Sequence, residues 1–199
     1  MEAAHSVGFF SVIGHGIPLD LIDQAFQVSA EFFSQPQDSK EKQSPFAKEL
    51  NAGYEYFSQV RPSTGTTDQK ESLQITAREG AMDGRWPKTP DNFQEISNQL
   101  MVEAHKLACR VLDLLEKDAC PMNQPGDLSR SHKLWASDGQ CTLRMLHYPP
   151  MDADTAKRLT TPDEEGRIHW RAGPHTDWYV MLRNTFQRLV RALCLISHA

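Results

Sequence analysis

The residues best suited to chemistry in this 199-residue chain are His175 and Asp177. They lie two positions apart, so in a β-strand both side chains leave the same face and reach one ion. An imidazole and a carboxylate are two ligands of a metal site. Two histidines and one carboxylate on one face of the metal form the ligand set of non-haem iron(II) centres. The pattern predicts a metal site at His175 and Asp177, with a third ligand from elsewhere.

The segments around this pair give it more weight than its spacing alone. Chance gives about half a His-x-Asp match in a chain with 8 His and 14 Asp. Residues 143–150 read LRMLHYPP, an acidic segment follows, and residues 171–178 read RAGPHTDW. A Leu-Arg-x-x-x-Tyr-Pro strand, an acidic loop and a Gly-x-His-Thr-Asp strand in this order resemble the isopenicillin N synthase-like family of iron(II)/2-oxoglutarate-dependent dioxygenases.

Earlier segments extend the resemblance. Residues 8–18 are similar to the family's Gly-Phe-Phe-x-Val-x-x-His-Gly-Ile signature, and residues 53–57, 68–75 and 85–87 resemble its Gly-Tyr, Asp-x-Lys-Glu and Trp-Pro segments. In the family, a helix and a strand precede the first signature, and strands with a distal histidine and an Arg-x-Ser pair follow the last. The match stops after Trp178, so the resemblance implies a family member that is truncated at both ends.

The resemblance implies roles for three residues. His175 and Asp177 become ligands of iron(II), and Tyr148 becomes a cofactor-binding residue against 2-oxoglutarate or the substrate. An aromatic packed in the core, with its hydroxyl satisfied nearby, is an equally open interpretation of Tyr148. The third ligand is not assigned, since His198 lies in a segment that no family motif matches. His15, in a Gly-His-Gly turn, is interpreted as structural, and no residue is assigned a catalytic role.

The implied function is that of an oxidoreductase that uses iron(II) and 2-oxoglutarate on a small organic molecule and is impaired by truncation. The alternative is a catalytically inactive fragment or a protein-interaction module. Composition favours a small-molecule partner, because the net charge is −5 and no block of basic residues suggests a nucleic-acid footprint. No stretch approaches the roughly 20 apolar residues of a membrane span. The four cysteines show no regular spacing, which indicates reduced thiols in a cytoplasmic protein, expected to be a monomer.

The expected fold is α+β: an incomplete double-stranded β-helix, or jelly roll, backed by N-terminal helices and followed by a helical C-terminal tail. Apolar spacing predicts helices over residues 19–33 and from Thr89–Pro90 to Pro121, and a shorter polar helix is expected over residues 38–43. Alternation predicts a strand over 140–148, and the acidic residues at 152–165 are expected in a surface loop. The tail contains Leu182, Phe186, Leu189, Leu193 and Ile196 at helical spacing.

The expected organisation has three parts. Residues 1–121 form an N-terminal helical region with the first strands, residues 122–178 form a partial jelly-roll core, and residues 179–199 form an amphipathic tail outside the family pattern.

Overall fold

The structure is a computed structural model that describes residues 2, 6, 10–60, 65–139, 141–171, 183–184 and 193–195. Its helices are α2 (Leu19–Phe33), α3 (Gln37–Gln43), α4 (Phe93–Ala119), α5 (Asp127–Ser131) and α6 (Ala153–Thr160), with a short 3-10 turn η1 (Lys48–Leu50). Its strands are β1 (Phe10–Val12), β2 (Gly53–Tyr56), β3 (Glu71–Thr76), β4 (Thr142–His147), β5 (Arg183–Asn184) and β6 (Leu193–Leu195).

Helix α2 occupies the predicted residues. It begins after Pro18, whose fixed φ suits a helix entry, and its apolar residues recur at three- and four-residue steps. The buried face consists of Leu21, Ile22, Ala25, Val28, Phe32 and Phe33. The Ser34 amide donates to the carbonyl of Ala30 at 3.0 Å, and Pro36 then separates α2 from α3. The prediction for residues 19–33 is confirmed.

Helix α4 is the long helix that the sequence predicts, but its predicted start is wrong. It begins at Phe93, and Asn92, not Thr89, occupies the cap position. The residues before it form a turn in which the amides of Lys88 and Thr89 donate to the Gln43 side chain at 2.9 and 3.2 Å. Those amides are therefore held by the end of α3 instead of entering the helix. At about 1.5 Å per residue, α4 is roughly 40 Å long.

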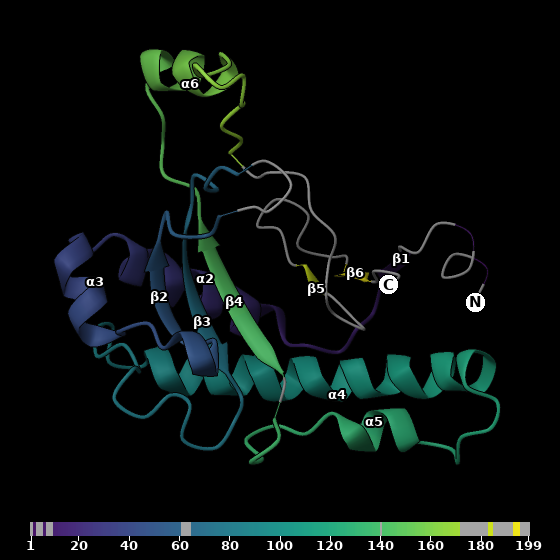
Figure 1. Ribbon diagram of the computed structural model, residues 1–199. Coiled ribbons are helices and arrows are strands. Elements are labelled where there is room, and N and C mark those ends of the chain that lie inside the picture. The colour runs from purple at the N-terminus through teal and green to yellow at the C-terminus, as the bar shows by residue number, and fades with distance from the viewer. Residues whose placement is uncertain are drawn as a thin grey trace.

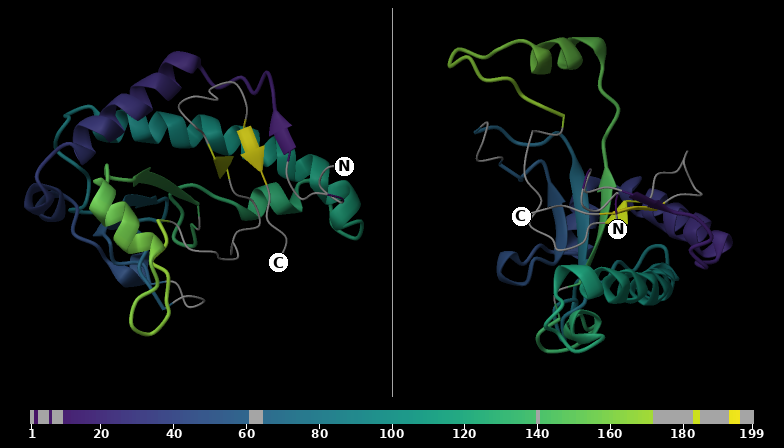
Figure 2. Two further views of the ribbon diagram at one scale, coloured as in Figure 1. Left: turned by 90° about the horizontal axis from the view of Figure 1, so that it is seen from above. Right: turned by 90° about the vertical axis from the view of Figure 1, so that its right-hand side faces the viewer.

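Strands β2, β3 and β4 form an antiparallel sheet in the order β2-β3-β4. Helices α2 and α4 lie on one face of this sheet (Figures 1 and 2). The register pairs Tyr54 with Leu73 and Leu73 with Met145, so these three side chains share the face that the helices cover. All three are buried. The strand predicted over residues 140–148 is confirmed at Thr142–His147.

A second antiparallel sheet has the order β1-β6-β5. In it Phe10 pairs with Leu195, and Arg183 pairs with Leu195 on the other side. The helical tail predicted for residues 179–199 is therefore wrong at the residues of that stretch which the structure describes. The hydrogen-bonding groups of β1 need a partner strand, and strand pairing overrides the helical spacing of the apolar residues here.

The surface loop predicted for the acidic residues at 152–165 is wrong for residues 153–160, whereas residues 161–165 lie in a loop and turn as predicted. Residues Ala153–Thr160 form α6, which stands beyond the end of β4 and away from α4 (Figure 1). Asp152 starts this helix, because its carboxylate accepts hydrogen bonds from the Thr155 amide at 2.7 Å and from the Thr155 hydroxyl at 3.0 Å.

The α+β fold class is confirmed at the level of helices packed on antiparallel sheet. Across the described ranges, each of the two sheets has three strands and no closed barrel forms. No helix among the described residues is both long and apolar enough to cross a membrane.

Gly53, at the start of β2, occupies a position that only glycine fits. Its φ is +107°, and a Cβ there would lie 2.5 Å from the carbonyl oxygen of Pro45. We expect Gly53→Ala to lower the free energy of unfolding by about 1–3 kcal/mol through overpacking and backbone strain. Gly14→Ala is the control, since Gly14 also has a positive φ but a Cβ there would have no atom within 4 Å. Equal losses in the two variants, measured by urea unfolding, would show that crowding by Pro45 is unimportant.

Candidate functional site

Tyr148 lies directly after β4, and its half-buried ring contacts Arg171. The Arg171 guanidinium lies over the ring, 5.5 Å from its centroid, and donates to the carbonyls of Tyr148 at 2.9 Å and Pro149 at 3.1 Å. The backbone amide of Gln69 in turn donates to the Arg171 carbonyl at 3.1 Å. The loop before β3 and the segment after α6 therefore meet at Tyr148.

The predicted metal ligands, His175 and Asp177, lie outside the described residues. They follow Arg171 by four and six positions, so the chain enters the predicted ligand segment from beside Tyr148. Among the described residues, no group of three His, Cys, Asp or Glu side chains is placed to hold a metal ion. The prediction of His175 and Asp177 as metal ligands therefore stays a prediction, and Arg171 is the last described residue before them.

Two other histidines have structural contacts. His15 accepts a hydrogen bond at Nδ1 from the Ile17 amide at 3.1 Å, as expected for a residue that fixes a turn. His105 on α4 contacts the carbonyl of His132 through Nε2 at 2.5 Å and thereby ties α4 to the segment after α5.

A buried cluster of ionisable side chains lies on the helix-covered face of the sheet. Glu71, the first residue of β3, is its centre. Lys40 on α3 donates to the Glu71 Oε2 atom at 2.6 Å, and the Tyr54 hydroxyl donates to the same oxygen. His147 at the end of β4 is hydrogen-bonded through Nδ1 to the Oε1 atom at 2.6 Å. The side chains of Lys40 and Glu71 are only 5 % and 3 % exposed.

This cluster changes the pKa of two of its members. Burial alone would raise the pKa of the Glu71 carboxyl, but the hydrogen bonds from Lys40, Tyr54 and His147 outweigh it and lower the pKa below the ordinary 4.5. The pKa of Tyr54 is strongly raised, first by burial and then by its hydrogen bond to the Glu71 carboxylate. Glu71 therefore stays ionised and Tyr54 stays protonated at neutral pH.

The lowered pKa of Glu71 predicts a contribution to acid sensitivity. A carboxyl with a depressed folded-state pKa stabilises the fold fully above its unfolded pKa, here near 4.5, and loses that contribution as pH falls through the folded value. We expect Glu71→Gln to flatten the pH dependence of stability below about pH 4.5 relative to the parent chain. Chemical unfolding between pH 3 and 7 measures this, and identical slopes for the two proteins would contradict it.

Two further polar groups accompany the cluster. Asp68 and Lys70 form a second buried pair at 2.7 Å, with side chains 1 % and 5 % exposed. On the opposite face of the sheet, Glu55 accepts a hydrogen bond from Gln74 and lies 3.7 Å from the Arg144 guanidinium. Residues 68–75 resemble a family segment, but that resemblance does not predict these pairs. A usable signal is the presence of charged residues at the entrance of a buried strand, because buried charges require partners.

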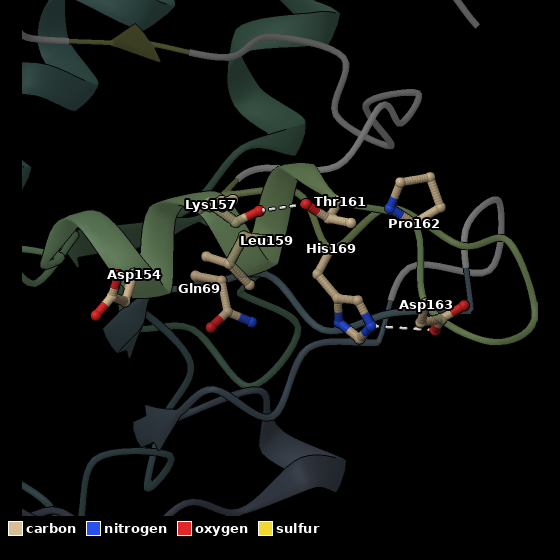
Figure 3. Close-up of a pocket in the computed structure, with 8 residues that line it drawn as sticks. All are labelled: Gln69, Asp154, Lys157, Leu159, Thr161, Pro162, Asp163 and His169. Carbon is tan, nitrogen blue, oxygen red and sulfur yellow. Dashed lines mark hydrogen bonds and ion pairs between the residues drawn. The ribbon is translucent and has the colours of Figure 1, made fainter.

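A pocket of about 590 Å³ lies between α6 and the loop before β3 (Figure 3). Its lining residues are Gln69, Asp154, Lys157, Leu159, Thr161, Pro162, Asp163 and His169. Asp163 organises one wall, since it accepts hydrogen bonds from the Arg167 amide at 2.7 Å and the Arg167 Nε at 2.9 Å and pairs with His169 at 3.2 Å. The Arg167 amide is the largest cause that lowers the pKa of Asp163 to about 2, although desolvation opposes the shift.

Comparison of the sequence with known proteins shows the family to which the chain belongs. The domain family described as "non-haem dioxygenase in morphine synthesis N-terminal" matches residues 1–107. Gibberellin 2-beta-dioxygenase 1 of Pisum sativum is 29 % identical over 149 residues, which are 75 % of this chain and 43 % of that protein. A 2-oxoglutarate-dependent dioxygenase of Didymella fabae is 31 % identical over 174 residues, covering 78 % of this chain and 50 % of the relative. This chain thus spans about half the length of these relatives.

Solved structures show the same fold. A full-length Neurospora crassa protein, crystallised in complex with alpha-KG and thymine, matches with a TM-score of 0.70 at 20 % identity over 98 % of this chain and 66 % of that one. JOX2 in complex with 2OG, Fe and JA matches with a TM-score of 0.67 at 20 % identity, over 98 % of this chain and 59 % of that one. At such identities the likeness concerns the fold alone.

Proposed function

Because the chain belongs to the iron(II)/2-oxoglutarate-dependent dioxygenase family, we propose that it contributes the helical layer and first strands of an oxygenase that acts on a small organic molecule. The observation that carries the proposal is the meeting of Tyr148 and Arg171 at the end of β4. This contact brings the chain beside Tyr148 just before the predicted ligand segment. The likeness to oxygenase structures supports an incomplete jelly roll as the architecture.

We assign His175 and Asp177 as two iron(II) ligands and Tyr148 as a residue that lines the 2-oxoglutarate site. When bound, iron(II) and 2-oxoglutarate would supply the oxidation of a substrate C–H bond by molecular oxygen, with one oxygen atom going to the substrate, the other to succinate, and the lost carboxyl group leaving as carbon dioxide. The chain's own contribution is positional. Arg171 fixes the backbone and ring of Tyr148, and the half-buried ring keeps water from one side of the site.

The experiment is to incubate the purified chain with iron(II), ascorbate and 2-oxoglutarate and to measure succinate. Release is expected from the parent chain and from His198→Ala, and a loss to background from His175→Ala, because removing one of few ligands abolishes a weak site. Stoichiometric iron binding is measured in parallel. Equal succinate release from the parent and from His175→Ala would refute the assignment of His175.

A catalytically inactive fragment or interaction module is the second candidate. The pairing of β6 with β1 favours it, because a strand beyond the family motifs pairs with a strand of the family's first segment. Stoichiometric iron binding that is lost in His175→Ala would count against it.

The organisation is proposed as residues 1–121, 122–178 and 179–199, and α4 ends just before the first boundary. We also propose a cytoplasmic monomer. Cys109, Cys120 and Cys141 have free thiols, which supports a reducing compartment. Size-exclusion chromatography with light scattering tests the monomer, and a dimer mass would refute it.

A further inference from the structure

His147, which immediately precedes Tyr148, connects the buried Glu71 cluster to the candidate site. It is the last residue of β4 and lies directly opposite Glu71 in the register. An ionised carboxylate only accepts hydrogen bonds, so the imidazole Nδ1 carries the proton and donates to Glu71 over 2.6 Å. The ring also stacks on Phe33 of α2, with centroids 5.4 Å apart and planes at 29°. The position and the tautomer of this imidazole are both fixed.

The cluster joins the helical layer to this strand end. Lys40 on α3 donates to Glu71 on β3 and also to the carbonyl of Phe33, at 2.9 Å, where α2 ends. Glu71 then accepts from His147 on β4. Three consecutive hydrogen-bonded side chains therefore run from α3 across β3 to the residue before Tyr148.

Stability alone is a poor explanation for such a chain of groups. Replacing a buried ion pair by apolar residues of similar volume is often neutral or stabilising, so the pair is weak evidence of a stability role. The hydrogen bonds among Lys40, Glu71 and His147 instead fix the orientation of each side chain, since hydrogen bonds restrict orientation more narrowly than apolar contacts do. The last of these oriented side chains is His147, and the peptide bond between His147 and Tyr148 passes the constraint to Tyr148.

Tyr148 is thus held from both sides. His147 fixes the backbone before it, and Arg171 fixes its carbonyl and its ring after it. We propose that Lys40, Glu71 and His147 are positioning residues that set the orientation of Tyr148 toward 2-oxoglutarate. This proposal rests on the proposed function only for the identity of the ligand.

The test compares His147→Leu, which cannot donate to Glu71, with His147→Gln, whose amide can. Lys40→Met removes the hydrogen-bond donor at the other end of this series of side chains. Lys42→Met is its matched control, because Lys42 pairs with Asp38 on the same helix in solvent. The first readout is the affinity for 2-oxoglutarate in the presence of Mn(II), with metal affinity measured separately. We expect His147→Leu and Lys40→Met to bind 2-oxoglutarate about tenfold more weakly at unchanged metal affinity. His147→Gln and Lys42→Met are expected to match the parent.

The second readout is hydrogen exchange of the Tyr148 amide, which needs neither metal nor ligand. Exchange is expected to be faster in His147→Leu and restored in His147→Gln. If the parent chain binds no 2-oxoglutarate, the proposed function fails while exchange still decides the positioning role. Unchanged exchange of the Tyr148 amide in His147→Leu would overturn the positioning proposal. If the parent binds 2-oxoglutarate, an equal affinity for it in His147→Leu would also overturn the proposal.

Discussion

Replacing Lys40 with methionine is expected to lower the free energy of unfolding by about 3–5 kcal/mol. Methionine fills the volume of the lysine stem but carries no charge. Glu71, with a side chain 3 % exposed, would keep its negative charge without the ammonium group that lies 2.6 Å away. Equilibrium unfolding in urea at pH 7 measures the loss.

Two comparisons isolate the cause of this loss. Lys42→Met removes an exposed pair from the same helix, with side chains 79 % and 71 % exposed, and should cost about 0.5 kcal/mol or less. The double variant Lys40→Met/Glu71→Gln removes both charges and should recover part of the stability, since no uncompensated charge is left in the core. If Lys40→Met is as stable as Lys42→Met, the Lys40–Glu71 pair is unimportant for stability.

The sequence predicts the helical layer well because that layer depends on local patterns. The spacing of apolar residues gives Leu19–Phe33 to the residue, and in the predicted long helix α4 the buried apolar residues include Phe93, Ile96, Leu107, Val111 and Leu112. The start of α4 could not be read in the same way. The residues before it are held by Gln43, a side chain about 45 positions away, and no local propensity contains that contact.

The predictions for the tail and for residues 153–160 are wrong for related reasons. Leu193 fits a helical stripe with its apolar neighbours, yet it pairs with Val12 near the other end of the chain. The residues after Pro150 resemble a solvated loop because they are acidic, although acidic residues such as Asp152 also favour helix starts. Composition alone does not separate these two outcomes.

The sequence also predicts only part of the candidate site. A motif identifies Tyr148, and the structure adds Arg171 as its neighbour. Glu71 is visible within the Asp-x-Lys-Glu segment, but its partners Lys40 and His147 are 31 positions before it and 76 after it. Only the packing of α3 and the register of β4 bring these three side chains together. Motifs thus predict candidate ligand-binding residues such as Tyr148, and tertiary structure is needed to identify the side chains that position those candidates.

Phe32→Ala is expected to destabilise the chain by about 3–5 kcal/mol, a loss comparable to that of Lys40→Met. Phe32 is fully buried and joins the helices to the sheet. Its ring lies 5.8 Å from Tyr54 on β2 and 5.6 Å from Phe93 on α4, with the Tyr54 contact edge-on. Alanine would leave a cavity where α2, α4 and β2 meet, and Tyr54 would lose an aromatic neighbour. Urea unfolding measures the change.

Leu19→Ala is the matched control, because Leu19 lies in the same helix with 47 % of its surface exposed. It should change stability by about 0.5 kcal/mol or less. Phe32→Leu keeps most of the volume and should lose less than Phe32→Ala while removing the aromatic contacts. If Phe32→Ala and Leu19→Ala lose the same amount, the helical layer does not depend on this core position.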